Sequence, residues 1–218
     1  EIKFNNGYGD VVVPIHLTTT YARQSLEEIR GGYDYIRSGN PTRQALEEKL
    51  ASLEGSSYAY AFSSGLAAES SLLLSLLHQG DHIIAFYDIY GGTQRLFNDI
   101  LTQYGFEITY VDATEPENVE RAIRENTRLV WIESPSNPFL RLCDIQAIAD
   151  IAHKKDVLLV VDNTFLSPYF QRPLELGADV VSYSATKYLG GHSDVLAGAL
   201  TTNNKQIADR IYLQQNAT

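Results

Sequence analysis

The sequence predicts an α/β fold: a mostly parallel sheet with helices on both faces. Two features predict it. From about residue 41 onward, strand-like and helix-like segments alternate, and most strand-like segments are short and wholly apolar. A strand that is apolar on both sides is buried on both sides, which happens when helices cover the sheet above and below.

Six strands can be located from these short runs. They are residues 58–62, 82–86, 108–111, 129–132, 157–161 and 179–183. In sheets of this kind a ligand binds beyond the carboxyl ends of the strands, so the residues that follow each strand are the first candidates for a site.

The first long helix has clear signals at both ends. Asn40-Pro41 supplies a cap residue and a first-turn proline, and Gly55 is suited to end the helix. Leu46, Leu50 and Leu53 recur at helical spacing and are expected to form its apolar face.

Further helices are expected between the strands. Thr114 and Glu117 have the spacing of a capping box, which predicts that a helix begins there. The expected helices span 65–77, 91–104, 114–126 and 144–155. Residues 1–40 show no regular period and are expected to form an extended arm, whereas 41–218 form one large domain that is incomplete at its C-terminal end.

Composition excludes several functions. The net charge of -10 disfavours binding to nucleic acid or to an anionic membrane, and no apolar run approaches the ~20 residues that span a bilayer. Residues 1–6 lack a signal-peptide pattern, and the single cysteine, Cys143, excludes an internal disulfide. We expect a cytoplasmic protein. The chain has no methionine and ends in what looks like an unfinished helix, so we expect a fragment of a longer protein.

The most informative segment is 182–194, which places Lys187 among small hydroxyl residues and glycines directly after a strand. A lone lysine usually lies on the surface. A lysine that forms a Schiff base with pyridoxal 5'-phosphate (PLP) needs this setting, because neighbouring hydroxyls hold the phosphate.

Other strand exits offer the remaining parts of a PLP site. Ser64-Gly65-Leu66 opens a helix, whose free N–H groups attract phosphate, and Ser184 and Thr186 could bind the same group. Taken alone, a serine-capped turn explains these residues equally well.

The cofactor ring has three candidate contacts. Asp162 ends an apolar strand, where a pyridinium nitrogen would pair with the carboxylate; a turn or cap aspartate is the alternative. Tyr90 could stack on the ring or simply pack in the core. Asn137, in a loop with two prolines, could contact the ring hydroxyl or a substrate, or only shape a rigid loop.

No metal site is expected. His78 and His82 are four residues apart, but Gly80-Asp81 breaks any helix between them, and His192 is expected to be a structural loop residue.

The joint pattern resembles the family of Cys/Met-metabolism, or trans-sulfuration, PLP-dependent enzymes. The motifs that carry the resemblance are 35–42, 63–65, 90–93, 133–138, 161–164 and 184–188. It implies PLP-dependent transferase fold type I, with a seven-stranded sheet and a smaller C-terminal domain that is absent from this chain. That domain carries the arginine that binds the substrate carboxylate.

The resemblance also implies roles. Lys187 would be the Schiff-base lysine and proton shuttle, Asp162 would pair with the pyridine nitrogen, and Tyr90 would stack on the ring and assist proton transfer. The phosphate would be bound by Ser64, Gly65, Leu66, Ser184 and Thr186. Asn137 would contact the ring hydroxyl and substrate, and Arg95 the distal end of the substrate. Tyr35 and Arg37 would reach the phosphate of a neighbouring subunit in a homo-oligomer, a dimer of dimers.

The implied reaction is γ-elimination of cystathionine to cysteine, 2-oxobutanoate and ammonia. Ser38 favours it, because synthases that use a succinylated homoserine carry a second arginine there, and Gly92 stands where methionine γ-lyases place a cysteine. γ-Replacement on an O-acylhomoserine stays open, as do an aminotransferase of the same fold and a fragment that binds without catalysis. A dinucleotide-binding module is disfavoured, because the chain has no G-x-G-x-x-G.

Overall fold

The computed structural model describes residues 9–218, and the first eight residues of the predicted arm lie outside the described part. A seven-stranded sheet forms the centre, in the order β1-β7-β6-β5-β4-β2-β3. The strands are β1 (Tyr58–Phe62), β2 (His82–Phe86), β3 (Glu107–Val111), β4 (Thr127–Glu133), β5 (Leu158–Asp162), β6 (Val180–Tyr183) and β7 (Gly198–Thr202).

The prediction of a mostly parallel sheet is confirmed. Strands β2 to β6 pair in parallel, whereas β7 is antiparallel to both of its neighbours, β1 and β6. The six located strands all form, with ends displaced by at most two residues. The seventh, β7, reads Gly-Ala-Leu-Thr-Thr and is not wholly apolar, yet it is buried along its whole length between β1 and β6.

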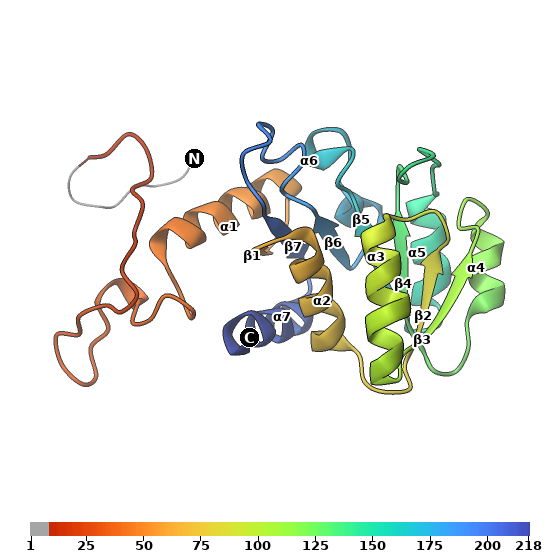
Figure 1. Cartoon of the computed structure of the whole chain (residues 1–218), viewed down its shortest axis with the longest axis horizontal. Coiled ribbons are helices and arrows are strands. Elements are labelled where there is room, and N and C mark those ends of the chain that lie inside the picture. The colour runs from red at the N-terminus through yellow and green to blue at the C-terminus, as the bar shows by residue number, and fades with distance from the viewer. Residues whose placement is uncertain (1–8) are drawn as a thin grey trace.

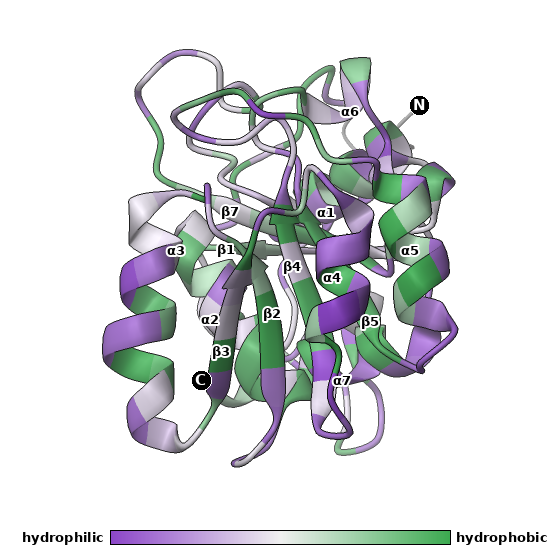
Figure 2. Ribbon diagram, turned by 90° about the vertical axis from the view of Figure 1, so that its right-hand side faces the viewer, coloured by the Kyte–Doolittle hydropathy of each residue, from purple (hydrophilic) through white to green (hydrophobic). Residues whose placement is uncertain are grey.

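Helices cover both faces of the sheet, as Figure 2 shows with α2 and α3 on one side and α4 and α5 on the other. The α-helices are α1 (Pro41–Glu54), α2 (Gly65–Leu76), α3 (Gly91–Arg95), α4 (Pro116–Ala122), α5 (Ile145–His153), α6 (Ser167–Phe170) and α7 (Lys205–Ala217). Helix α3 continues as a π-helical segment (Leu96–Ile100) and a 3₁₀ segment (Leu101–Tyr104), and two short 3₁₀ turns span Arg30–Gly32 and Pro173–Leu176. No helix within residues 9–218 is long and apolar enough to cross a membrane.

Helix α1 begins and ends as predicted. The Asn40 side chain accepts hydrogen bonds from the backbone N–H groups of Thr42 and Arg43, and Gly55 adopts the left-handed conformation that closes the helix. The predicted apolar face is only partly right. Leu50 is buried, but Leu46 is 48% and Leu53 38% exposed, because no layer of the described chain packs over that side.

The capping box at Thr114 and Glu117 was wrong. The Thr114 hydroxyl donates to the Asp112 carboxylate at 2.6 Å instead of capping a helix. Helix α4 therefore begins at Pro116 and ends at Ala122, four residues before the predicted end at 126.

The arm leaves the layered body of the molecule (Figure 1). Apart from one 3₁₀ turn and an isolated bridge between Thr20 and Tyr35, residues 9–40 have no regular structure. Over the part that the structure describes, the arm is therefore almost without helix or strand.

Candidate active site

One cavity lies where the loops that follow the strands converge. It is lined by Ser64, Gly65, Leu66, Glu69, Tyr90, Glu133, Asn137, Asp162, Thr164, Phe165, Ser184, Thr186, Lys187 and Leu196. Nine of the twelve predicted site residues are among them, and the three that are not are Tyr35, Arg37 and Arg95.

The N-terminus of α2 forms one wall of this cavity. The Ser64 side chain caps the helix by accepting from the Ala67 N–H at 3.0 Å. A Cβ added to Gly65 would lie 3.0 Å from the Ser184 Cβ, and one added to Gly198 would lie 2.0 Å from the Ser64 carbonyl oxygen. Glycine therefore lets three chain segments meet, which places the hydroxyl loop of Ser184 beside free helix N–H groups suited to an anion.

Lys187 lies on the loop after β6, in a tight turn. Its backbone N–H donates to the Ser184 carbonyl at 3.0 Å, and its carbonyl accepts from the Gly191 N–H at 2.7 Å. The side chain is exposed and lines both this cavity and a neighbouring one next to Tyr188. Its amino group makes no hydrogen bond or ion pair with any residue of 9–218, so the amine is available for a covalent bond.

Asp162 ends β5 and is 6% exposed. Its Oδ1 accepts from the Thr164 N–H at 2.9 Å. Burial raises the pKa of this carboxyl, whereas the hydrogen bonds from Thr164 act in the opposite direction. The ion pairs of the described chain involve other residues, so Asp162 has no cationic partner. A protonated ring nitrogen would supply one.

Tyr90 and Glu133 are joined at the next two strand exits. The Tyr90 backbone N–H donates to Glu133 Oε2 at 2.8 Å. Burial, and then the Asp162 charge, raises the pKa of Glu133 to about 9, against the lowering effect of this bond. A Cβ added to Gly92 would lie 2.2 Å from the Tyr90 ring, so the ring occupies the space that a side chain at position 92 would need.

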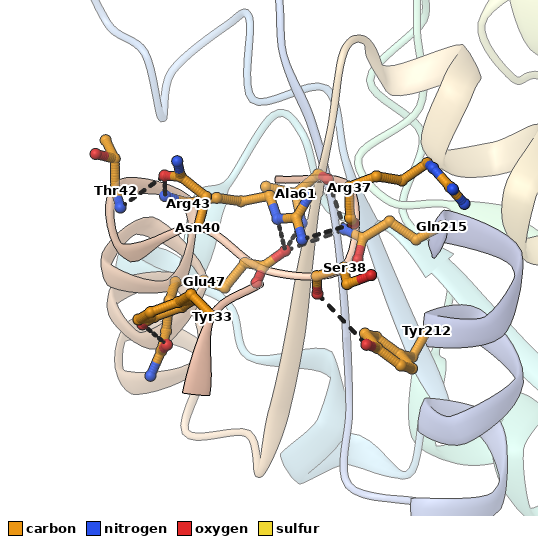
Figure 3. Close-up of polar contacts among 11 residues, drawn as sticks. Tyr33, Arg37, Ser38, Asn40, Thr42, Arg43, Glu47, Ala61, Tyr212 and Gln215 are labelled. Carbon is orange, nitrogen blue, oxygen red and sulfur yellow. Dashed lines mark hydrogen bonds and ion pairs between the residues drawn. The ribbon is translucent and has the colours of Figure 1, made fainter. Parts of the chain in front are cut away.

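Tyr35 and Arg37 lie on the arm instead of in the cavity of their own chain. The Arg37 guanidinium sits over the Tyr35 ring, 5.4 Å from its centroid. Its Nη1 also donates to the carbonyl of Asn216 in α7, and Figure 3 shows Arg37 on the side of the arm that faces this helix. Arg95 is exposed on α3, near Gly91, and does not line the cavity.

The sequence reasoning missed several lining residues. Glu69, Phe165 and Leu196 were not identified, and Glu133 and Thr164 were noted without a role. A signal existed for Glu69, because it is the one charged residue of its helix and lies four residues after Gly65, on the same helix face. We find no comparable signal for Phe165 or Leu196.

The histidines have structural partners. Both ring nitrogens of His82 lie 2.8 Å from threonine hydroxyls, those of Thr127 and Thr109, and His192 contacts the Gly190 carbonyl at 2.9 Å. In the described part of the chain, no group of three or more His, Cys, Asp or Glu side chains is arranged to hold a metal ion.

These features fit PLP one by one. A free amine matches its aldehyde, a capped helix N-terminus with neighbouring hydroxyls matches its phosphate, and a buried carboxylate without a cation matches its pyridine nitrogen. Fold and cavity together are those expected of an α/β protein that binds PLP.

Comparison with known proteins identifies the family. Residues 2–218 match the family described as "Cys/Met metabolism PLP-dependent enzyme". The chain therefore belongs to this family, whose cofactor is PLP.

Similar proteins carry different activities in their names. The chain is 51% identical to cystathionine beta-lyase MetC of Staphylococcus haemolyticus, over 97% of this chain and 54% of that protein. It is 48% identical to a probable cystathionine gamma-synthase of Herpetosiphon aurantiacus, over 96% of this chain and 65% of that protein. The solved structure of cystathionine gamma-lyase from Lactobacillus plantarum, complexed with L-serine, matches with a TM-score of 0.95 and 43% identity. The match covers 99% of this chain and 56% of that one. The chain thus spans between about half and two thirds of the length of these relatives.

Proposed function

We propose that the chain is the cofactor-binding domain of a PLP-dependent trans-sulfuration enzyme that eliminates the γ-substituent of cystathionine, giving cysteine, 2-oxobutanoate and ammonia. The observation that carries the proposal is that Lys187, Asp162 and the N-terminus of α2 line one cavity. Membership in the family supports it.

Each part of PLP has a holder among the lining residues. The phosphate would be held by the α2 N-terminus and by the hydroxyls of Ser184 and Thr186, the ring nitrogen by Asp162, and the ring face by Tyr90. Asn137 would contact the ring hydroxyl and the substrate. Once bound, PLP supplies an electron sink for the charge that develops on the substrate carbons.

The residues of the chain then transfer protons and keep the ring nitrogen of the cofactor protonated. Nζ of Lys187 is free of other bonds, so it can accept the proton of the substrate α carbon and return one later. Asp162 holds the proton on the ring nitrogen. Tyr90 is fixed at its backbone by Glu133 and stands beside the reacting groups, where its hydroxyl can assist proton transfer.

Ser38 supports elimination over replacement. Its hydroxyl donates to the Asn216 side chain at 3.2 Å and its carbonyl accepts from the Tyr212 hydroxyl at 3.4 Å, so a neutral residue occupies this position of the arm. A succinylated substrate would find no cation in the Ser38 side chain. γ-Replacement on an O-acylhomoserine, by a cystathionine gamma-synthase or an O-acetylhomoserine sulfhydrylase, uses the same early steps and is the alternative.

We further propose a cytoplasmic homo-oligomer, a dimer of dimers, that acts on a small sulfur amino acid or homoserine ester. Tyr35 and Arg37 would complete the phosphate site of a neighbouring subunit. Two observations support this: neither residue lines the cavity of its own chain, and a guanidinium binds phosphate well.

The test of the proposed function is covalent trapping of the cofactor. Borohydride reduction of the PLP-loaded chain should fix PLP on Lys187, which peptide mass spectrometry locates. Lys187→Ala should abolish the fixation and lower turnover by at least about a hundredfold, the usual loss with an acid–base group. Lys155→Ala changes an exposed lysine outside the cavity and should leave both unchanged.

Product analysis then separates the activities. Incubation with cystathionine should release 2-oxobutanoate and ammonia. Pyruvate would instead indicate β-elimination, and absence of turnover by a chain that binds PLP would indicate a fragment without catalysis. A chain that takes up no PLP would contradict the whole proposal.

A further inference from the structure

Glu69 is a buried acid to which the reaction described above assigns no role. It is the one charged residue of α2, which otherwise reads Gly-Leu-Ala-Ala before it and Ser-Ser-Leu-Leu-Leu-Ser-Leu after it. The residue is 3% exposed and lies one helical turn after Gly65, so its carboxyl lines the cavity.

The carboxyl of Glu69 is only partly satisfied. The Thr93 side chain, in the first turn of α3, lies near enough to lower the pKa of this carboxyl. Its Oε2 is buried and has no hydrogen-bond partner among the described residues. A buried polar atom without a partner is costly, and here it lies at the wall of a ligand cavity.

Two more buried carboxyls line the same cavity, those of Asp162 and Glu133. Burial, and then the Asp162 charge, raises the pKa of Glu69 to about 8, while the Thr93 side chain acts against the shift. The Glu69 charge in turn raises the pKa of Glu133. Buried carboxyls that line one cavity and act on one another in this way do not all ionise at neutral pH, and the raised pKa favours the protonated form of Glu69.

The other elements packed against α2 do not offset this effect. Their ionisable groups are Tyr58 and Tyr60 on β1, Arg95 on α3, Tyr183 on β6, and Lys205, Asp209, Arg210 and Tyr212 on α7. Within residues 9–218, Asp162 is the charge that shifts the Glu69 carboxyl.

We propose that Glu69 is a positioning residue, which holds a proton beside Asp162 and presents a neutral O–H at the cavity wall, so that Asp162 alone faces the cofactor ring as a carboxylate. The inference rests on the proposed function, because it requires PLP in this cavity. Glu69 acts through Asp162 and not on the substrate.

The test compares two variants that differ in hydrogen bonding. Glu69→Gln keeps the shape and a neutral donor but cannot titrate, whereas Glu69→Leu fills the space without a donor. Titration of the purified 218-residue chain with PLP, followed by cofactor absorbance, gives the dissociation constant of each variant. At pH 7 the Gln variant should bind PLP within about twofold of the parent chain, and the Leu variant about tenfold more weakly, the size of one hydrogen bond.

The pH dependence distinguishes a proton-holding role from a merely structural one. Above pH 8 the parent chain loses the Glu69 proton and gains a second carboxylate, whereas the Gln variant does not change. The ratio of the PLP dissociation constant of the parent chain to that of the Gln variant should therefore change from about one at pH 7 by at least about threefold at pH 9.5. All other groups of the chain and PLP itself are the same in both proteins, so their contributions cancel in the ratio.

Glu54 provides the matched control. It is 1% exposed, burial raises its pKa to about 7, and it bonds Tyr183 away from the cavity. Glu54→Gln should change the melting temperature but leave the PLP constant unchanged at both pH values.

The inference is overturned if the Leu variant binds PLP as well as the parent chain, if the Gln variant behaves like the Leu variant at pH 7, or if the ratio stays flat. Each of these results is compatible with PLP fixed on Lys187, so they leave the proposed function intact. Failure of the parent chain itself to bind PLP would overturn the proposed function instead.

Discussion

The cavity and the arm are built in opposite ways. Glu69, Glu133 and Asp162 are each at most 6% exposed, and the strands beside them are held in a continuous core. Between residues 9 and 40 Asn40 alone is buried, and large apolar side chains such as Val11 (90%) and Leu26 (93%) face outward. The acidic groups of the cavity are therefore buried within one chain, whereas the arm from residue 9 onward leaves large apolar side chains exposed, which supports its proposed role against a second copy.

The cavity is where the largest single effect on cofactor binding is expected. Asp162→Asn keeps the acceptor for the Thr164 N–H but removes the charge that the ring nitrogen requires. The PLP dissociation constant should rise about 10- to 100-fold, the value of a hydrogen bond to a charged group. Absorbance titration of the purified chain measures it.

Asp156→Asn is the control for this change. Asp156 is exposed, and its positive φ of 57° is one that asparagine tolerates well. Equal PLP affinity of the Asp162 variant and the parent chain would contradict this prediction. It would show that the carboxylate has only a structural role and does not contribute to binding the cofactor.

The arm should matter through a neighbouring subunit. Arg37→Ala removes a phosphate contact and should weaken PLP binding about tenfold. Mixing this variant with Lys187→Ala, after dissociation and reassembly, should recover tight sites that combine Lys187 of one chain with Arg37 of the other. In a 1:1 mixture of two-fold pairs, about a quarter of all sites would be of this kind. Borohydride fixation at a low PLP concentration counts them.

The control for this mixture is each variant reassembled with itself. Neither should gain tight, fixable sites. If the mixture also gains none, Arg37 does not bind the cofactor of a neighbouring subunit. The exposure of the arm would then need an explanation within a single chain.

The cavity could be predicted from sequence because strand exits share one edge of a parallel sheet. Lys187, Asp162 and Ser64 are separated along the chain. They lie at or just after the carboxyl ends of β6, β5 and β1, which share one edge of the sheet. Unusual residues at such exits identify a site even when each one has an ordinary explanation.

The features that escaped prediction depend on tertiary contacts. The spacing of Glu69 from Gly65 indicates its helix face, but its burial follows from how α2 packs against β7, β6 and β1. Strand β7 is buried by two neighbours despite its threonines, and Thr114 bonds Asp112 instead of capping a helix. Propensity and residue spacing indicate which local structures a segment can form, and tertiary packing determines which of them it adopts.

The smallest effect is expected where the arm meets its own chain. The Tyr212 hydroxyl of α7 donates to the Ser38 carbonyl at 3.4 Å, a long bond on a side chain that is 42% exposed (Figure 3). Because water replaces such a bond readily, Tyr212→Phe should lower the free energy of unfolding by no more than about 0.5 kcal/mol in a urea titration, with unchanged PLP affinity. A clear loss of PLP affinity would mean that docking of the arm on α7 shapes the cofactor site, and the arm would then belong to the same structural unit as the cavity.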